Sequence, residues 1–229
     1  MNGKHTPRKK DRRPAFSLIE LLVAIAVIGI LAALSVTAIG EMRLQGQITR
    51  NLSNLRNLQL ANIAYATDHN GLYVPGCSFD GDGRLGNTWV SNKTFLCQYL
   101  GLPSNLRWPT EMRSPMAVML YDEDGLILNN SYGYNFTGLA SYGTPNASRQ
   151  ATVAGVGEPA ATLAFADALD WQIQMNGADR YRGREEGQNN AIAYRYNGRA
   201  GVVHFDGHAA MLRREEVVGN EKLWIVHKN

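Results

Sequence analysis

One uncharged run near the N-terminus constrains this chain more than any other feature. No charged residue lies between Glu20 and Glu41, and the 20 residues between them are mostly Leu, Ile, Val and Ala. In a helix, about 20 residues extend about 30 Å, which is the hydrocarbon thickness of a bilayer. The sequence therefore predicts a transmembrane helix over residues 16–40.

The charge on either side of this run predicts its orientation. The first 15 residues hold six basic side chains and one acid, Asp11, and such a basic flank stays on the cytoplasmic side. The rest of the chain is then extracytoplasmic and anchored by a single helix. A cleavable secretory signal is the alternative. Its apolar core normally has about 7–15 residues, fewer than here, although the small residues of "LAALSVTA" also suit a signal cleavage site.

One carboxylate, Glu20, lies inside the apolar run. An ionised carboxylate in hydrocarbon is costly unless it is paired. Neither a simple anchor nor a signal peptide needs such a residue. We therefore expect a cationic group to meet Glu20 inside the membrane or inside an assembly.

Residues 15–23, Ala-Phe-Ser-Leu-Ile-Glu-Leu-Leu-Val, resemble the N-terminal motif of type IV prepilins and type II secretion pseudopilins. The resemblance implies that prepilin peptidase removes residues 1–15 by cutting between Ala15 and Phe16, and that Phe16 is then N-methylated. The family usually has glycine at the position of Ala15. Glu20 becomes the fifth residue of the mature chain. There it can pair with the terminal ammonium group of a neighbouring subunit and set the register of assembly, a use of a buried ion pair that stays a hypothesis.

Helical periodicity continues beyond the apolar run and predicts an amphipathic stem helix over residues 41–71. Its apolar positions recur every three or four residues and are Leu44, Ile48, Leu52, Leu55 and Leu58. We expect this stripe to pack on the sheet of the following domain rather than form a coiled coil with a partner. Asn70 and Gly71 suit a left-handed cap at the end of the helix.

Residues 72–229 predict an extracytoplasmic α+β head. The candidate strands cover residues 88–90, 117–121, 161–166, 201–205 and 208–212, and Ser91 is a candidate cap for a short helix that ends near Gly101. Long turn-rich loops separate them. The expected fold is α+β and pilin-like, with a long N-terminal helix packed on an antiparallel sheet with irregular loops.

The sequence "HFDGH" near the C-terminus has the composition of a metal site. Asp-Gly between two apolar runs is, however, a strong hairpin signal. If Asp206 and Gly207 form a two-residue turn, His204 pairs with Ala209, and His204 and His208 lie on opposite faces of the ribbon. The pattern then predicts a structural hairpin with Asp206 pointing away from both histidines, and no metal site.

The same hairpin is similar to the C-terminal H-x9-D-G signature of a group of proteins associated with prepilin processing. In that signature a histidine stands ten positions before the aspartate, whereas this chain has Tyr196 there. The missing histidine favours a structural role. The alternative function is a membrane-anchored extracytoplasmic binding domain, or a metal-dependent hydrolytic domain that uses His204, Asp206 and His208.

The two cysteines, Cys77 and Cys97, leave two alternatives open. In an oxidising compartment they can form a disulfide, which would close a loop worth about 3 kcal/mol in the chain-entropy model. They can equally remain as two free, buried thiols. Zinc normally needs more ligands at closer spacing.

Two acidic motifs are candidate sites with more ordinary explanations. The "DGDG" at residues 80–83 resembles the start of a calcium loop, but the twelfth position holds Ser91 instead of glutamate. Calcium stays an alternative to a simple turn, and no other cofactor is indicated. Asp167 and Asp170 follow an apolar strand, where aspartates are common in turns. A catalytic carboxylate pair is the less favoured interpretation, because the sequence supplies no partner for it.

These patterns together predict a pseudopilin or minor pilin-like structural subunit of a type II secretion or type IV pilus-like filament, and not an enzyme. Its partners would be prepilin peptidase, other pilin or pseudopilin subunits and the bacterial inner membrane. The net charge of +3 comes from the basic tail. No basic stripe interleaved with aromatic residues follows that tail, so nothing indicates nucleic-acid binding.

Overall fold

The computed structural model of the chain describes residues 17–103, 105, 108–118, 120–121, 127–128, 131–139, 145, 148–185 and 190–226. Its internal contacts divide the chain into two units, of which the first ends at Arg43 and the second begins at Leu44.

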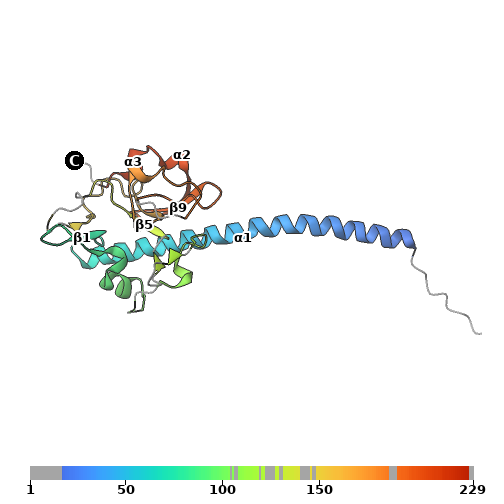
Figure 1. The fold of residues 1–229 in the computed structure, drawn as a ribbon, viewed down its shortest axis with the longest axis horizontal. Helices are drawn as coiled ribbons and strands as arrows, with labels where there is room; N and C mark the ends of the chain where they lie inside the picture. The colour runs from blue at the N-terminus through green and yellow to red at the C-terminus, as the bar shows by residue number, and fades with distance from the viewer. Residues whose placement is uncertain are drawn as a thin grey trace, which may run out of the picture. The chain divides into compact units, whose positions relative to one another are not determined.

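A single helix, α1, runs from Leu18 to Asp68 over 51 residues (Figure 1). The predicted transmembrane and stem segments are thus parts of one helix. It ends as predicted, because Asn70 and Gly71 both have left-handed backbones, with φ of 54° and 78°. The Gly71 amide donates a hydrogen bond back to the carbonyl of Ala66 at 2.8 Å, which satisfies a carbonyl at the end of the helix.

The core of the head is a five-stranded sheet in the order β10-β9-β7-β5-β8. All neighbours are antiparallel except β5 and β8, which are parallel. The strands are β5 (Tyr132–Asn135), β7 (Leu163–Asp167), β8 (Gln172–Ile173), β9 (Arg199–His204) and β10 (Ala209–Arg213). Three of the predicted strands correspond to β7, β9 and β10. The α+β, pilin-like fold class is confirmed.

Smaller elements surround this sheet. The strands β1 (Cys77–Phe79), β2 (Leu85–Thr88) and β6 (Ser148–Arg149) form a second sheet, and β3 (Leu120–Tyr121) pairs with β4 (Ile127–Leu128). The short helical turns are η1 (Trp89–Ser91), η2 (Phe95–Tyr99), η3 (Thr110–Met112), η4 (Met175–Gly177), α2 (Arg214–Val217) and α3 (Glu221–Trp224).

Two local predictions between residues 88 and 101 were wrong. The predicted strand 88–90 is the 3-10 turn η1, and the real strand β2 ends at Thr88. The short helix that follows is capped by Asn92, not Ser91, because the Asn92 Oδ1 accepts the Phe95 amide at 3.0 Å. The Ser91 hydroxyl instead accepts the Thr88 amide at 2.9 Å.

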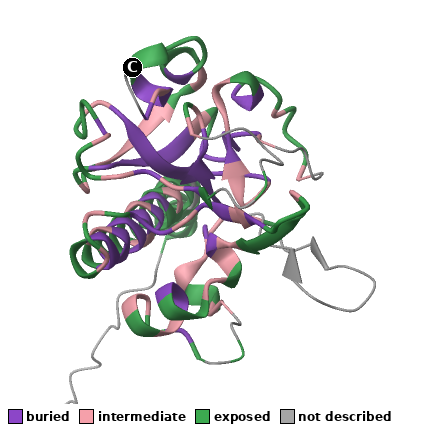
Figure 2. Cartoon of the chain, turned by 90° about the vertical axis from the view of Figure 1, so that its left-hand side faces the viewer, coloured by how far each residue is buried: buried purple, intermediate pink, exposed green. Residues whose placement is uncertain are grey.

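The large sheet separates two apolar cores. On one face, Phe165 and Val203 pack with Leu55 of the stem part of α1. On the other face, Val202 packs with Trp224 of α3. Figure 2 shows buried segments in the middle of the sheet and along the helix. The head therefore has three layers, with the stem helix, the sheet and the C-terminal helices in that order.

Candidate functional site

The first half of α1 exposes its apolar side chains. Between residues 18 and 42 the described large apolar side chains are 49 % to 83 % exposed. The helix is long and apolar enough to cross a membrane, and no part of its most apolar 18-residue window is buried. A signal sequence has the same composition, whereas the core helix of a soluble protein would be buried. An exposed apolar surface of this size marks a site of interaction with lipid or protein.

Glu20 caps the start of this helix. Its Oε2 accepts the Ser17 amide at 2.9 Å, and the Ser17 carbonyl accepts the first helical bond from the Leu21 amide at 3.2 Å. Glutamate three residues after a serine N-cap is a capping-box arrangement, and the pattern Ser-x-x-Glu could have predicted it. Ala15 and Phe16, the predicted cleavage and methylation residues, lie outside the described residues.

The stem half of α1 joins the head through buried amide side chains as well as apolar ones. Asn51, Gln59 and Asn62 are fully buried on the stripe that carries Leu55 and Leu58. Polar groups at such positions are stable only when they are hydrogen-bonded. The predicted stripe was purely apolar, and the amides at matching helical spacing are the residues that this prediction missed.

Each amide reaches a different part of the head. Asn51 donates to Asp167 Oδ2 at 2.7 Å and accepts the Tyr132 hydroxyl at 2.9 Å. Gln59 donates to the Phe205 carbonyl at 2.8 Å. Asn62 donates to Gln59 at 3.1 Å and accepts the Val74 amide at 2.9 Å. These bonds hold the helix in one axial position, because a slip along its axis would leave several buried groups without partners.

Asp167 is the centre of the buried polar network. Besides Asn51, it accepts the Gly201 amide at 2.7 Å, and its Oδ1 lies 3.7 Å from Arg195. Burial raises the pKa of the Asp167 carboxyl, and the charge of Arg195 opposes that effect. Arg195 also binds Glu185 at 2.6 Å. The network is enclosed inside the head, and we therefore interpret its role as structural.

Gly201 permits this close approach. A Cβ atom at this position would lie 2.4 Å from Asn51 Nδ2, a distance that requires one of the two to move. Asp170, the second acid of the motif, is partly exposed and accepts the Trp171 amide at 2.7 Å. The two aspartates therefore serve different local structures.

The C-terminal hairpin has a different register from the predicted one. His204 pairs with His208, through a bond from the His204 amide to the His208 carbonyl at 2.9 Å, and Ala209 pairs with Val203. A two-residue type I′ turn needs positive φ at both central residues, but only Gly207 has it, with φ of 94°. The chain instead uses a three-residue loop that ends at Gly207, and this shifts the pairing by one residue.

The shift brings the two histidines together. Their rings stack with centroids 3.9 Å apart and planes 9° from parallel, so the prediction that they lie on opposite faces was wrong. Asp206 also does not point away, because its Oδ1 binds His208 Nδ1 at 2.7 Å and accepts the His208 amide at 3.0 Å.

Stacked rings do not make this cluster a chelate. The nitrogen lone pairs of stacked imidazoles lie in nearly parallel planes, whereas two ligands of one ion must converge on it. Within the described part of the chain, no group of three or more His, Cys, Asp or Glu side chains is placed to hold a metal ion. The hydrolytic alternative therefore receives no support from the geometry.

The residues predicted for calcium and for a disulfide have local explanations. Asp80 Oδ1 accepts the amides of Asp82 and Arg84 at 3.0 and 2.8 Å, and so closes the turn between β1 and β2. Both cysteines are free thiols in the structure. Cys77 is buried in β1, and burial raises the pKa of its thiol to about 11. Cys97 lies half-buried in η2.

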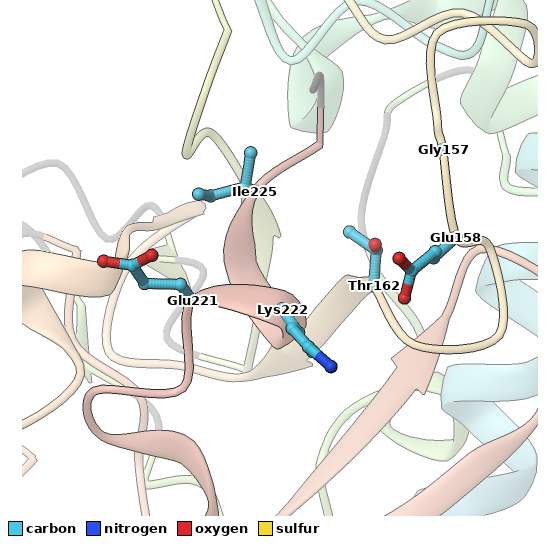
Figure 3. Close-up of a pocket in the computed structure, with 6 residues that line it drawn as sticks. All are labelled: Gly157, Glu158, Thr162, Glu221, Lys222 and Ile225. Carbon is cyan, nitrogen blue, oxygen red and sulfur yellow. The ribbon is translucent and has the colours of Figure 1, made fainter. Parts of the chain in front are cut away.

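A cavity of about 150 Å³ opens beside α3. Its lining is Gly157, Glu158, Thr162, Glu221, Lys222 and Ile225. In Figure 3 Glu158 and Thr162 lie on the same side of the cavity, and Glu221 projects away from them. The lining carries charges of both signs.

The comparisons with known proteins match one segment of the chain. Residues 10–36 match the family model of the prokaryotic N-terminal methylation motif. No curated protein and no solved structure shows significant similarity to the chain. The match covers the end of the basic tail, Ala15, Phe16, Glu20 and most of the exposed apolar helix.

The motif and the fold agree on a class of protein. The motif implies processing by prepilin peptidase, and a pilin-like α+β fold behind such a motif suggests a type IV pilin or pseudopilin. Proteins of this kind are usually not enzymes. The apolar helix with its prepilin motif suggests an inner-membrane anchor and an extracytoplasmic head.

Proposed function

We propose that this chain is a pseudopilin or minor pilin-like structural subunit of a type II secretion or type IV pilus-like filament. One observation carries the proposal: the methylation motif at residues 10–36 continues directly into a helix that exposes its apolar side chains over residues 18–42. The same helix then continues into a head to which it is bonded by buried amides. Its work is mechanical, because the apolar segments pack in a filament and the heads are displayed outside.

Glu20 has a double role in this proposal. One of its oxygens accepts the Ser17 amide of its own chain. A carboxylate offers about four lone-pair sites on two oxygens, so capping the helix leaves room for a second donor. Cleavage before Phe16 creates an ammonium group, and that of a neighbouring subunit is the donor we propose. The pair then neutralises a charge in an apolar environment and sets the axial register.

The mass of the mature N-terminus tests this proposal. The full-length chain is expressed in a host with prepilin peptidase and recovered from the membrane. We expect the recovered protein to begin at a methylated Phe16. A host without that peptidase is the control and should retain residues 1–15. Mature protein that keeps these residues in both hosts, or that is cut after the apolar run, would contradict the proposal.

A second test concerns Glu20 itself. We expect Glu20→Ala to be made and inserted in the membrane but to be excluded from filaments containing wild-type subunits, because the ammonium of the neighbour would lose its partner. Incorporation is measured by tagging the variant and determining its fraction in purified filaments. Glu41→Ala, at an exposed position of the same helix, is the matched control and should incorporate normally. Equal incorporation of both variants would show that Glu20 does not set the register of assembly.

A further inference from the structure

The tip of the C-terminal hairpin attaches the sheet to the stem helix. The Phe205 carbonyl accepts the Gln59 side chain at 2.8 Å, and the Phe205 ring lies 5.0 Å from that of Tyr73. A Cβ at Gly207 would lie 3.9 Å from Ile63 and 4.0 Å from Leu60. The conformation of residues 204–208 therefore decides whether this end of the sheet stays on the helix.

Two histidines close this tip in an unusual arrangement. His204 is 6 % exposed, and its Nδ1 is buried without a hydrogen-bond partner. Its ring stacks on His208 at 3.9 Å, while the His208 side chain is 49 % exposed and bonded to Asp206. A buried polar atom without a hydrogen-bond partner calls for an explanation. One explanation is that the His204 ring must stay uncharged for the tip to remain closed.

We propose that the stacked pair is an acid-sensitive latch, which holds the hairpin tip on the stem helix near neutral pH and releases it when both rings are protonated. One imidazolium can stack on a neutral imidazole, and Asp206 balances its charge. A second proton would place two like charges 3.9 Å apart, with one of them in a buried site, and such charges repel strongly. This use of the latch rests on the proposed extracytoplasmic location of the head, where pH follows the surroundings.

The groups around the pair decide how readily His204 takes up a proton while the tip is closed. Burial lowers the pKa of His204, the charge of His208 lowers it further, and Asp206 acts in the opposite direction. Leu163, the β7 partner of His204, is neutral. The other charged residues on the adjoining elements are Glu158 before β7, Asp167 at the far end of β7, Arg199 and Arg213 at the open end of the hairpin, Arg214, Glu215, Glu216, Glu221 and Lys222 in the C-terminal helices, and Arg50, Arg56 and Asp68 in the stem part of α1.

The sign of the pH effect follows from that direction. A histidine whose pKa is lower in the folded chain than the ordinary value of about 6.5 takes up its proton first in the open or unfolded state. The stability of the closed tip is therefore complete above about pH 6.5 and falls as the pH drops below it.

Hydrogen exchange of the full chain in lipid nanodiscs tests the latch. We expect the protection of residues 199–213, corrected for the intrinsic exchange rate, to fall about tenfold or more between pH 7.5 and pH 5.0, because the open state takes up its protons first. His208→Gln removes the second charge but leaves His204 buried, so its protection should fall by a clearly smaller factor than that of the wild type. Asp206→Asn should move the transition to lower pH, because it removes the charge that favours protonation.

His69→Gln is the matched control, since His69 also stacks on an aromatic ring, that of Tyr65 at 3.8 Å, but lies outside the hairpin. This variant should keep the wild-type response. The latch is overturned if wild-type protection does not fall, if His208→Gln falls equally, or if residues 44–68 lose protection in parallel, which indicates global unfolding. Hydrogen exchange requires neither N-terminal processing nor filament assembly. The latch can therefore fail its test while the N-terminal mass and Glu20 tests succeed, and it can pass its test while they fail.

Discussion

Asp167→Ala is expected to lower the free energy of unfolding of the head by about 2–6 kcal/mol, because two buried donors each lose their acceptor at a cost of about 1–3 kcal/mol. The side chain is fully buried, and its loss leaves Asn51 Nδ2 and the Gly201 amide without an acceptor. Glu185 still neutralises Arg195 at 2.6 Å. The cost therefore comes mainly from unpaired donors at the joint between the stem and the sheet.

Denaturant unfolding of the full chain in nanodiscs measures this loss, with the fluorescence of the four tryptophans as the signal, because all four lie in the head. Asp82→Ala is the control, since the Asp82 side chain is 74 % exposed in a surface ion pair with Arg84 and such pairs contribute little. Asp167→Asn keeps one acceptor oxygen and should lie between the two. Equal stability of Asp167→Ala and Asp82→Ala would show that the network does not hold the joint.

Leu55→Ala should cost about 2–5 kcal/mol, the range for removing a large apolar side chain from a close-packed core. Leu55 is fully buried, and its Cδ1 lies close to the backbone of Gly201. Leu60→Ala, on the same helix, should change the free energy of unfolding by less than about 0.5 kcal/mol, as is usual for surface positions. Leu60 is 57 % exposed. Leucine and alanine are both good helix formers, so the difference between the variants isolates packing against the sheet.

The same unfolding measurement decides this prediction. If both variants lose the same stability, the loss reflects the helix itself rather than its packing on the head. If neither variant changes, the stem helix does not contribute to the fold of the head.

The predictions that succeeded rest on signals that act over short distances along the chain. The length of the uncharged run predicts one long helix, and the structure has α1 from Leu18 to Asp68. Asn70 and Gly71 mark its end because few other residues adopt a left-handed backbone at low cost. The Ser17–Glu20 cap was equally readable from its spacing, although it was not predicted.

The predictions that failed depended on partners far away in the sequence. Asp167 lies 116 positions from Asn51 in the sequence, and Tyr132 lies 81 positions from it. The residues next to Asn51 therefore do not indicate that its side chain will bond to either of them. In the hairpin, a turn of three residues instead of two changed the register. Because side chains alternate along a strand, that single step moved His208 to the face of His204.

The amino-acid sequence by itself determined the N-terminal segment of this protein, with its basic tail, its methylation motif and its apolar helix, because each of these features can be read from residues that are neighbours in the chain. The tertiary structure alone decided how the head is attached and what "HFDGH" does. Buried amides, a carboxylate and a stacked histidine pair take their roles from the groups that surround them, and only the packing of distant segments brings those groups together.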